Sequence, residues 1–164
     1  GSLLLKPAHL TSQAEYEATI AASLTTAFAT VRAAGRTMAS QQEPGAVVLV
    51  ASAAARTGLA NHEAIAAAKA GVIGLTQSAA ASYAPRKLRV NCVAPGLVRT
   101  ALTTRITSTA AGEQASLGMH ALGRLGEPED VAAMIAYLLS PAASWMTGQV
   151  IGVDGGLGVV RAGR

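Results

Sequence analysis

The chain has 164 residues, the size of one domain, and it is unusually apolar, with 51% hydrophobic and 13% charged residues. Its 13 Lys and Arg against 9 Asp and Glu could suggest a nucleic-acid partner, but the basic residues are scattered and aromatic residues make up 3%, which argues against such an interface. Because Cys92 is the only cysteine, an internal disulfide and a thiolate metal cluster are excluded.

Neither a membrane segment nor a metal site is predicted. No run approaches the roughly 18 uninterrupted apolar residues of a membrane span. The N-terminus GSLLLKPAHL lacks the basic region, long apolar core and cleavage site of a signal peptide. His9, His62 and His120 do not have the spacing of metal ligands. We therefore expect a cytoplasmic protein that binds neither membrane nor metal.

The first half of the chain predicts a helical region followed by a buried strand. Residues 11–40 are rich in Ala and Leu and predict one long helix or two short ones in series. Thr11 or Ser12 is the candidate N-cap, and Glu15 stands three positions after Ser12 as in a capping box. The sequence EPG then breaks the helix, and AVVLVAS has the continuous β-branched and aliphatic pattern of a strand in a parallel sheet.

The second half predicts two helices and two more strands. A helix is expected over residues 63–83, ended by Pro85, and LRVNCVAPG follows as a second buried strand. The segment to Gly123 is rich in Thr, Ser and Gly and predicts a flexible loop with a short helix. Pro128 begins a helix that runs to about Leu139, with acidic residues in its first turn. GQVIGVDGG is the third strand.

This alternation of strands and helices predicts an α/β fold with a parallel sheet covered by helices. Three strands are few for such a sheet. We therefore expect residues 1–164 to form a single truncated domain, equivalent to the C-terminal half of a Rossmann-like doubly wound sheet.

Five sequence blocks occur in order with matching gaps, namely VVLVASAA, IAAAKAGVIGLT, LRVNCVAPGLVRTAL, LGRLGEPEDVAAMIAYLLS and TGQVIGVDGG. Together they resemble the C-terminal two-thirds of a short-chain dehydrogenase/reductase. The resemblance implies NAD(P)-dependent oxidoreductase chemistry. It also implies a catalytic tetrad of serine, tyrosine, lysine and asparagine, and a loop that closes over the nicotinamide.

Two of the four tetrad positions are retained and two are changed. Ser52 falls on the serine position, where a hydroxyl would hold a substrate carbonyl or alcohol, although a strand-end serine can also bond its own backbone. Lys69 falls on the lysine position, which implies a bond to the nicotinamide ribose and a lowered tyrosine pKa. As an alternative, Lys69 is a solvated helix lysine. Ile65 replaces the tyrosine, and Ser23 replaces the asparagine.

Ile65 has no proton to give to the alkoxide that forms when hydride reaches a carbonyl. His62, three residues earlier, titrates near neutrality and could swing in as a substitute acid. We favour the interpretation of His62 as a loop or helix-start residue, and of Tyr83 and Tyr137 as packing residues at helix ends.

The nicotinamide end of a cofactor site is retained. Pro95, Gly96, Val98 and Thr100 match the family loop that meets the carboxamide, and Pro95 and Gly96 also fit a plain strand-ending turn. The family's glycine-rich turn should precede this chain, because Gly1 resembles the end of the Asn-Ala-Gly motif of the fourth strand. GVDGGLG follows a strand but leaves too few residues for a further helix and strand, so it is not that turn. We expect weak or no binding of NAD or NADP.

Three functional hypotheses follow. The chain is a catalytically silent or truncated oxidoreductase, a non-catalytic scaffold subunit that pairs with an active homologue, or a carbonyl reductase with an unusual acid. In the family, the matching long helices pair across a two-fold axis, so we expect a homo-oligomer or a heteromer with a full-length homologue. The interface is predicted at the small residues of the second helix, Ala66, Ala70, Gly74 and Ala81. Residues 101–121 carry no charged clamp that would identify a substrate.

Overall fold

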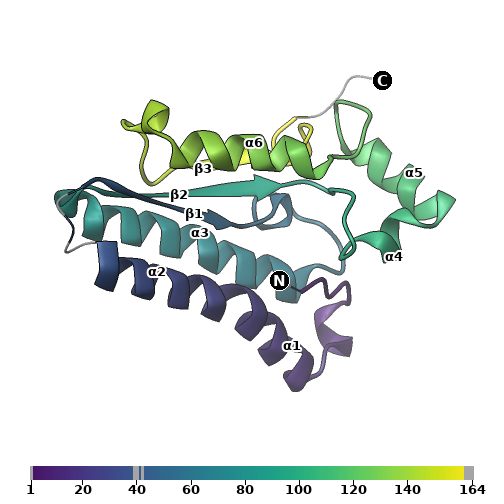
Figure 1. Ribbon diagram of the computed structural model, residues 1–164. Coiled ribbons are helices and arrows are strands. Elements are labelled where there is room, and N and C mark those ends of the chain that lie inside the picture. The colour runs from purple at the N-terminus through teal and green to yellow at the C-terminus, as the bar shows by residue number, and fades with distance from the viewer. Residues whose placement is uncertain (1, 39–40, 42, 161–164) are drawn as a thin grey trace.

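The computed structural model describes residues 2–38, 41 and 43–160, so Gly1 and its place in the Asn-Ala-Gly motif lie outside the described residues. Three parallel strands form a sheet in the order β1-β2-β3, namely β1 (Gly45–Val50), β2 (Leu88–Pro95) and β3 (Val150–Val153). Helices cover both faces of this sheet (Figure 1). The predicted α/β class with a parallel, Rossmann-like sheet is confirmed.

The N-terminal helical region is two helices in series, one of the two arrangements that the sequence left open. α1 (Gln13–Ile20) and α2 (Thr26–Thr37) are joined by a π-helical turn over Ala21–Thr25. Ser12 is the N-cap, and the capping box forms: its hydroxyl accepts from the Glu15 N–H at 3.2 Å, and the Glu15 carboxylate accepts from the Ser12 N–H at 2.8 Å. The π-helical turn holds Ser23, so it interrupts the helix at one of the candidate site positions.

The two faces of the sheet carry different helices. α3 (Glu63–Tyr83) and α2 cover one face, where Val31 of α2 shares a core cluster with Val47 of β1, and α6 (Pro128–Leu139) lies on the other face (Figure 1). Alternate residues of a strand point to opposite faces. Leu49 and Cys92 accordingly pack in the cluster under α3, whereas Val93 packs with Leu138 of α6. Burial on both faces explains why the strands read as continuous apolar runs.

Two polar residues of β2 anchor the chain that leaves α6. The Arg89 guanidinium donates to the carbonyl oxygens of Leu138 at 2.9 Å and Ser140 at 3.3 Å, where the helix ends. The Asn91 side chain donates to the Met146 carbonyl at 2.8 Å and accepts from the Gln149 N–H at 3.1 Å. These bonds fix the loop between α6 and β3 against the middle of the sheet.

The segment after β2 is more ordered than the sequence indicated. We expected a flexible loop with one short helix, but two helices form, α4 (Thr104–Thr107) and α5 (Ala110–Met119). Thr109 caps α5 by accepting from the Gly112 N–H at 3.2 Å. The small and polar composition concealed these helices because contacts with distant residues, described below, hold them in place.

Among the described residues, one helical stretch, α3 with the turn that follows it (Glu63–Arg86), is long and apolar enough to cross a membrane. A helix that covers a sheet meets the same test of length and composition. Ala68, Val72 and Thr76 are buried on α3, and Val72 belongs to the core under the sheet. The apolar character of α3 is therefore explained by its position in the domain.

Candidate functional site

The candidate site lies where the three parallel strands end. Ser52 follows β1, Gly96 follows β2 and Asp154 follows β3, and α4 and α5 lie beyond this end of the sheet (Figure 1). In open α/β sheets, ligands bind in the crevice outside the carboxyl ends of the strands. The fold thus brings the retained candidate residues to the edge where such a crevice forms.

Ser52 is half-buried and is the N-cap of a short 3-10 turn, Ala53–Ala55. Its Oγ accepts a hydrogen bond from the Ala54 N–H at 3.2 Å, so the serine does bond its own backbone. Among the described residues its hydroxyl hydrogen has no acceptor. The geometry orients the hydroxyl and leaves it able to donate a hydrogen bond.

Lys69 projects from α3 toward the end of β1. Its Nζ donates to the carbonyl oxygen of Val50 at 2.8 Å, two residues before Ser52 along the chain. Burial lowers the pKa of Lys69, because a charged ammonium loses hydration there, and a smaller effect from the Cys92 side chain raises it. Lys69 is therefore not the fully solvated lysine of the alternative interpretation.

The two residues that the sequence motifs assign to changed tetrad positions are buried. Ile65 lies one turn before Lys69 on α3 and is 4% exposed. Ser23 is 5% exposed in the π-helical turn, and its Oγ has no hydrogen-bond partner among the described residues. An aliphatic side chain has no donor, so Ile65 offers no proton.

Cys92 lies in β2 and is fully buried. Burial is the main cause that raises the pKa of its thiol, and its Sγ donates to the Val93 carbonyl at 3.4 Å. A neutral, buried thiol is a weak nucleophile. Cys92 is a core residue.

The loop that the sequence motifs match to the nicotinamide position is a tight turn held by backbone hydrogen bonds. The Gly96 N–H donates to the Val153 carbonyl at 3.1 Å, and Val98 pairs with Gly126 as an isolated bridge. A Cβ at Gly96 would lie 3.0 Å from the Asp154 Cα, so the close approach of the two strand ends requires glycine there. Thr100 is exposed, and its hydroxyl lies 3.1 Å from that of Thr103.

His120 is a residue of this region that sequence reasoning missed as part of the site. It is 4% exposed, its Nδ1 lies 2.7 Å from the Ser116 carbonyl oxygen, and its Nε2 accepts from the Leu97 N–H at 3.1 Å. These partners place the proton on Nδ1 of a neutral ring. The ring joins α5 to the turn after β2. Its only signal in the sequence was a histidine at the end of a polar segment.

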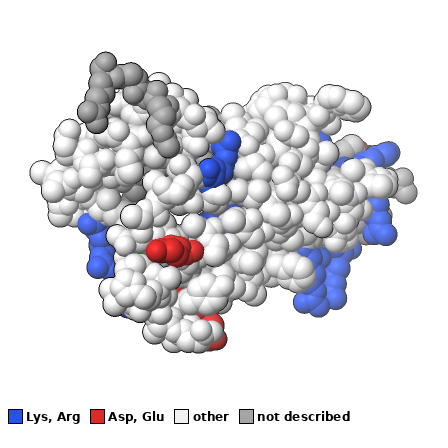
Figure 2. Space-filling view, turned by 180° about the vertical axis from the view of Figure 1, so that it is seen from behind, with Lys and Arg blue, Asp and Glu red and all other residues white. Residues whose placement is uncertain are grey.

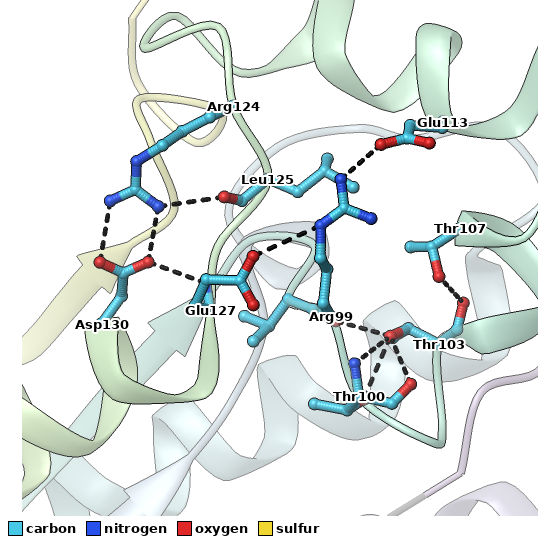
Figure 3. A network of polar contacts seen from close by, with 10 residues as sticks. Arg99, Thr100, Thr103, Thr107, Glu113, Arg124, Leu125, Glu127 and Asp130 are labelled. Atoms are coloured by element: carbon cyan, nitrogen blue, oxygen red, sulfur yellow. Dashed lines mark hydrogen bonds and ion pairs between the residues drawn. The ribbon is translucent and has the colours of Figure 1, made fainter. Parts of the chain in front are cut away.

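An ion-pair network continues from this loop to α6 (Figure 3). Arg99 pairs with Glu113 of α5 and, at 3.4 Å, with Glu127. Arg124 donates to both carboxylate oxygens of Asp130, at 2.7 and 2.8 Å, and this pairing holds the pKa of Asp130 well below its usual range. Residues 101–121 thus contain a charged group that pairs within the protein rather than with a ligand.

A cavity of about 320 Å³ opens between the turn after β2 and the end of β3. Its lining includes Gly96, His120, Asp130 and Asp154. Asp154 accepts from the Gly156 and Gly158 N–H groups at 3.0 and 3.1 Å, so the GVDGGLG segment is a turn folded around its own carboxylate.

The other residues singled out in the sequence lie at helix termini. His62 precedes α3, and its Nδ1 lies 2.7 Å from the Ala60 carbonyl oxygen, as expected for a helix-start residue. Tyr83 packs against the core under α3, whereas Tyr137 is partly exposed on α6. Within the described residues, no group of three or more His, Cys, Asp and Glu could hold a metal ion.

Comparison with known proteins connects this geometry to enzymes. The family model described as enoyl-(acyl carrier protein) reductase matches residues 2–158. A 3-oxoacyl-[acyl-carrier-protein] reductase of Thermotoga maritima is 44% identical over 117 residues, 71% of this chain and 47% of that protein. The enzyme of the same name from Chlamydia pneumoniae is 39% identical over 146 residues, 89% of this chain and 58% of that protein. The chain thus spans about half the length of these relatives.

Solved structures share the fold. A short-chain type dehydrogenase/reductase from Mycobacterium ulcerans superposes with a TM-score of 0.92 at 34% identity, covering 99% of this chain and 58% of the other. A 4-hydroxyisoleucine dehydrogenase complexed with NADH also gives a TM-score of 0.92, at 26% identity, covering 98% of this chain and 67% of the other. A 2-deoxy-D-gluconate 3-dehydrogenase candidate from Agrobacterium tumefaciens with bound NADP gives 0.89 at 30% identity, covering 96% and 64%.

Proposed function

The chain belongs to the short-chain dehydrogenase/reductase family of oxidoreductases, and from this premise we propose that it is a catalytically silent member. The proposal rests on Ile65, which is buried and which the order of the sequence blocks assigns to the position of the family's acid. Residues 1–164 then correspond to the C-terminal part of the family fold.

The retained residues explain what the site keeps and what it lacks. Ser52 can donate to a carbonyl oxygen, and Lys69 is held at the same edge by its bond to Val50. Hydride transfer leaves an alkoxide that needs a proton, and general acid catalysis supplies about 10²- to 10⁴-fold in rate. His62, the alternative acid, contacts the Ala60 carbonyl in its own turn. The site therefore binds a carbonyl without completing its reduction.

For the cofactor, the family relatives solved with NADH and NADP indicate a nicotinamide dinucleotide. Lys69 and the loop residues Pro95, Gly96, Val98 and Thr100 correspond to its nicotinamide end. Binding of the pyrophosphate, at the N-terminus of a helix after a glycine-rich turn, normally contributes much of the affinity for a dinucleotide. Since the 164 residues contain no such turn, we expect an affinity for either dinucleotide weaker than roughly millimolar.

A steady-state assay tests the proposed silence. The chain is incubated with NADH or NADPH and a ketone, a quinone or a 3-oxoacyl thioester, and oxidation of the cofactor is followed. We expect no turnover, and none in Ile65→Tyr, with Ile65→Phe as the control for ring size. Turnover that disappears in Lys69→Ala would overturn the proposal. A reductase created by Ile65→Tyr alone would show that the cofactor site is complete.

Calorimetry tests the cofactor separately. Titration of NAD⁺ and NADP⁺ into the chain should give no saturable heat below about millimolar concentration, because only the nicotinamide end is retained. A micromolar dissociation constant would mean that other residues of this chain bind the phosphates.

As a second candidate function, we propose a scaffold subunit that pairs through α2 and α3 with itself or with a full-length homologue. The observation that favours it is the outer face of α3, where Ala70, Gly74 and Ala81 are exposed and a Cβ at Gly74 would meet nothing within 4 Å. Phe28 of α2 is 56% exposed. Small residues permit close helix approach, and a two-fold dimer would bury this face twice.

Light scattering tests the interface. The chain is measured at micromolar concentration, alone and mixed with a full-length homologue, with Gly74→Glu as the disrupting variant. Gly118→Glu is the matched control, because Gly118 is also an exposed helical glycine with open space at its Cβ. We expect an assembly that Gly74→Glu alone breaks, through steric and desolvation cost. If the chain stays a stable monomer both alone and when mixed with the homologue, the scaffold function is overturned.

We propose further that the protein acts in the cytoplasm without membrane or nucleic-acid partners. The packing of α3 in the core supports the expectation of no membrane partner. Figure 2 supports the expectation of no nucleic-acid partner, because most of the rear face is uncharged and its Lys and Arg side chains stand in separate places rather than in one stripe. Fractionation of cells that express the protein, with and without nuclease, tests both: recovery with membranes or nucleic acid would contradict the assignment.

A further inference from the structure

Lys69 differs from the other lysines of the chain in what surrounds its amine. The chain has three lysines, Lys6, Lys69 and Lys87. Lys6 donates to both carboxylate oxygens of Glu15, at 2.9 and 3.0 Å, and Lys87 is exposed in a turn. Lys69 is half-buried, and its bond is to the Val50 carbonyl. Within the described residues, no carboxylate lies within 4 Å of its Nζ.

These surroundings favour the neutral amine. Burial lowers the pKa of Lys69, and its one opposing contribution comes from Cys92, a thiol that burial keeps protonated. In the family the neighbour one turn earlier is a phenol, whereas here it is the hydrocarbon of Ile65. A neutral amine can donate one N–H to the Val50 carbonyl and keep its lone pair for a ligand.

We propose that Lys69 is a nucleophilic amine that forms an imine with a small aldehyde or ketone bound at the carboxyl end of β1, beside Ser52. The proposal rests on the proposed function only for the carbonyl-binding role of Ser52. Amines of buried lysines without a counter-charge are a known type of activated nucleophile toward carbonyl groups.

The reaction balances without an oxidant, a reductant or a cofactor. The lone pair of Nζ forms a bond to the carbonyl carbon, and the π electrons move to the oxygen, which takes one of the two amine protons. The Ser52 hydroxyl donates a hydrogen bond to that oxygen. The carbon–oxygen bond then breaks, the oxygen leaves as water with the second amine proton, and a carbon–nitrogen double bond remains between the ligand and Lys69.

Reductive trapping tests the imine. The chain is incubated near neutral pH with propanal and sodium cyanoborohydride, digested, and mapped by mass spectrometry for propylated lysines. We expect Lys69 to be modified severalfold faster than Lys87, because burial lowers the pKa of Lys69 and so raises the fraction of its amine that is neutral. Lys6, held by Glu15, should react no faster than Lys87. Equal modification of Lys69 and Lys87, or a preference for Lys87, would overturn the proposal.

Variants separate a binding site from a merely reactive amine. Ser52→Ala should slow modification of Lys69 severalfold and leave Lys87 unchanged. Ile65→Glu places a carboxylate one turn from Lys69 and should suppress its modification, whereas Ala67→Glu, two positions away on a different side of the helix, should not. Circular dichroism checks that each variant is folded. If Ile65→Glu is unfolded, the comparison of Lys69 with Lys87 in the unaltered chain still decides.

The failure of this inference and that of the proposed function are distinguishable. Trapping at Lys69 without cofactor oxidation supports both. Cofactor oxidation with trapping at Lys69 overturns only the catalytic silence. Cofactor oxidation with no preference for Lys69 overturns both. If neither cofactor oxidation nor preferential trapping at Lys69 is observed, only the imine proposal is overturned.

Discussion

The candidate site has two sides that differ in how their polar groups are paired. On the α3 side, the Ser23 hydroxyl has no described partner and Lys69 bonds a single backbone carbonyl. On the loop side, both ring nitrogens of His120 are bonded and Arg99 is held by carboxylates. Groups that touch only a ligand do not stabilise the fold, so their replacement costs little free energy of unfolding. Replacement of groups that hold the chain together lowers the stability of the fold.

Removal of the His120 ring is the strongest test of this contrast. His120→Ala would leave the Leu97 N–H and the Ser116 carbonyl without their partner and open a cavity, so we expect a loss of about 2–4 kcal/mol in the free energy of unfolding. Urea denaturation measures it. His120→Phe keeps most of the volume and isolates the hydrogen-bond contribution. An unchanged midpoint in His120→Ala would show that the loop side is not held by this ring.

The same glycine-to-alanine substitution can be made on each side of the site, and its effect on stability compared. In Gly96→Ala the new Cβ would lie 2.7 Å from the His120 Nε2 and 3.0 Å from the Asp154 Cα, so we expect a loss of about 1–3 kcal/mol. Gly74→Ala on α3 meets open space and should raise stability by about 0.5–1 kcal/mol, because alanine favours a helix. Thermal unfolding of both variants measures the difference. Equal effects would remove the contrast.

The unpartnered hydroxyl of Ser23 predicts a substitution without cost. Ser23→Ala removes a buried polar atom that makes no described bond, so stability should be unchanged or rise by up to about 1 kcal/mol. The control is Thr76→Val, which loses a buried bond to the Val72 carbonyl, 2.8 Å long, and should cost about 1 kcal/mol. A clear loss in Ser23→Ala, measured by urea denaturation, would mean that the hydroxyl is bonded in solution.

The exposed pair Lys6–Glu15, before and within α1, gives the smallest effect. The bond from Lys6 is the main cause that lowers the pKa of Glu15 from 4.5 to about 2. Between these two values the unfolded chain binds more protons than the folded one, so stability falls as pH decreases from about 4.5 toward 2. Lys6→Met should weaken this dependence, and salt should screen it. Melting temperatures across that pH range, with equal slopes in both proteins, would contradict the prediction.

Much of the fold follows from the sequence because its signals are local. The predicted bounds of α3 at residues 63 and 83 agree with the structure, since a long apolar stretch rich in alanine forms the helix and Pro85 marks its end. The three strands were recognisable as continuous apolar runs for the same reason. Of α4 and α5, the sequence predicted one short helix, because α4 is a single turn with two threonines and α5 is interrupted by two glycines. Contacts from Glu113 and His120 to distant parts of the chain help to hold both helices in place.

By itself, the sequence determined which side chains the candidate site contains: an isoleucine cannot give a proton, and the order of five blocks predicted Ile65, Ser52 and Lys69 as site positions. The tertiary structure decided the state of those groups. It half-buries Lys69 against the Val50 carbonyl, leaves Ser23 without a described partner, and holds His120 as a neutral ring between α5 and β2. Residue identity sets what chemistry is available, whereas burial and pairing depend on residues far apart in the chain that only folding brings together.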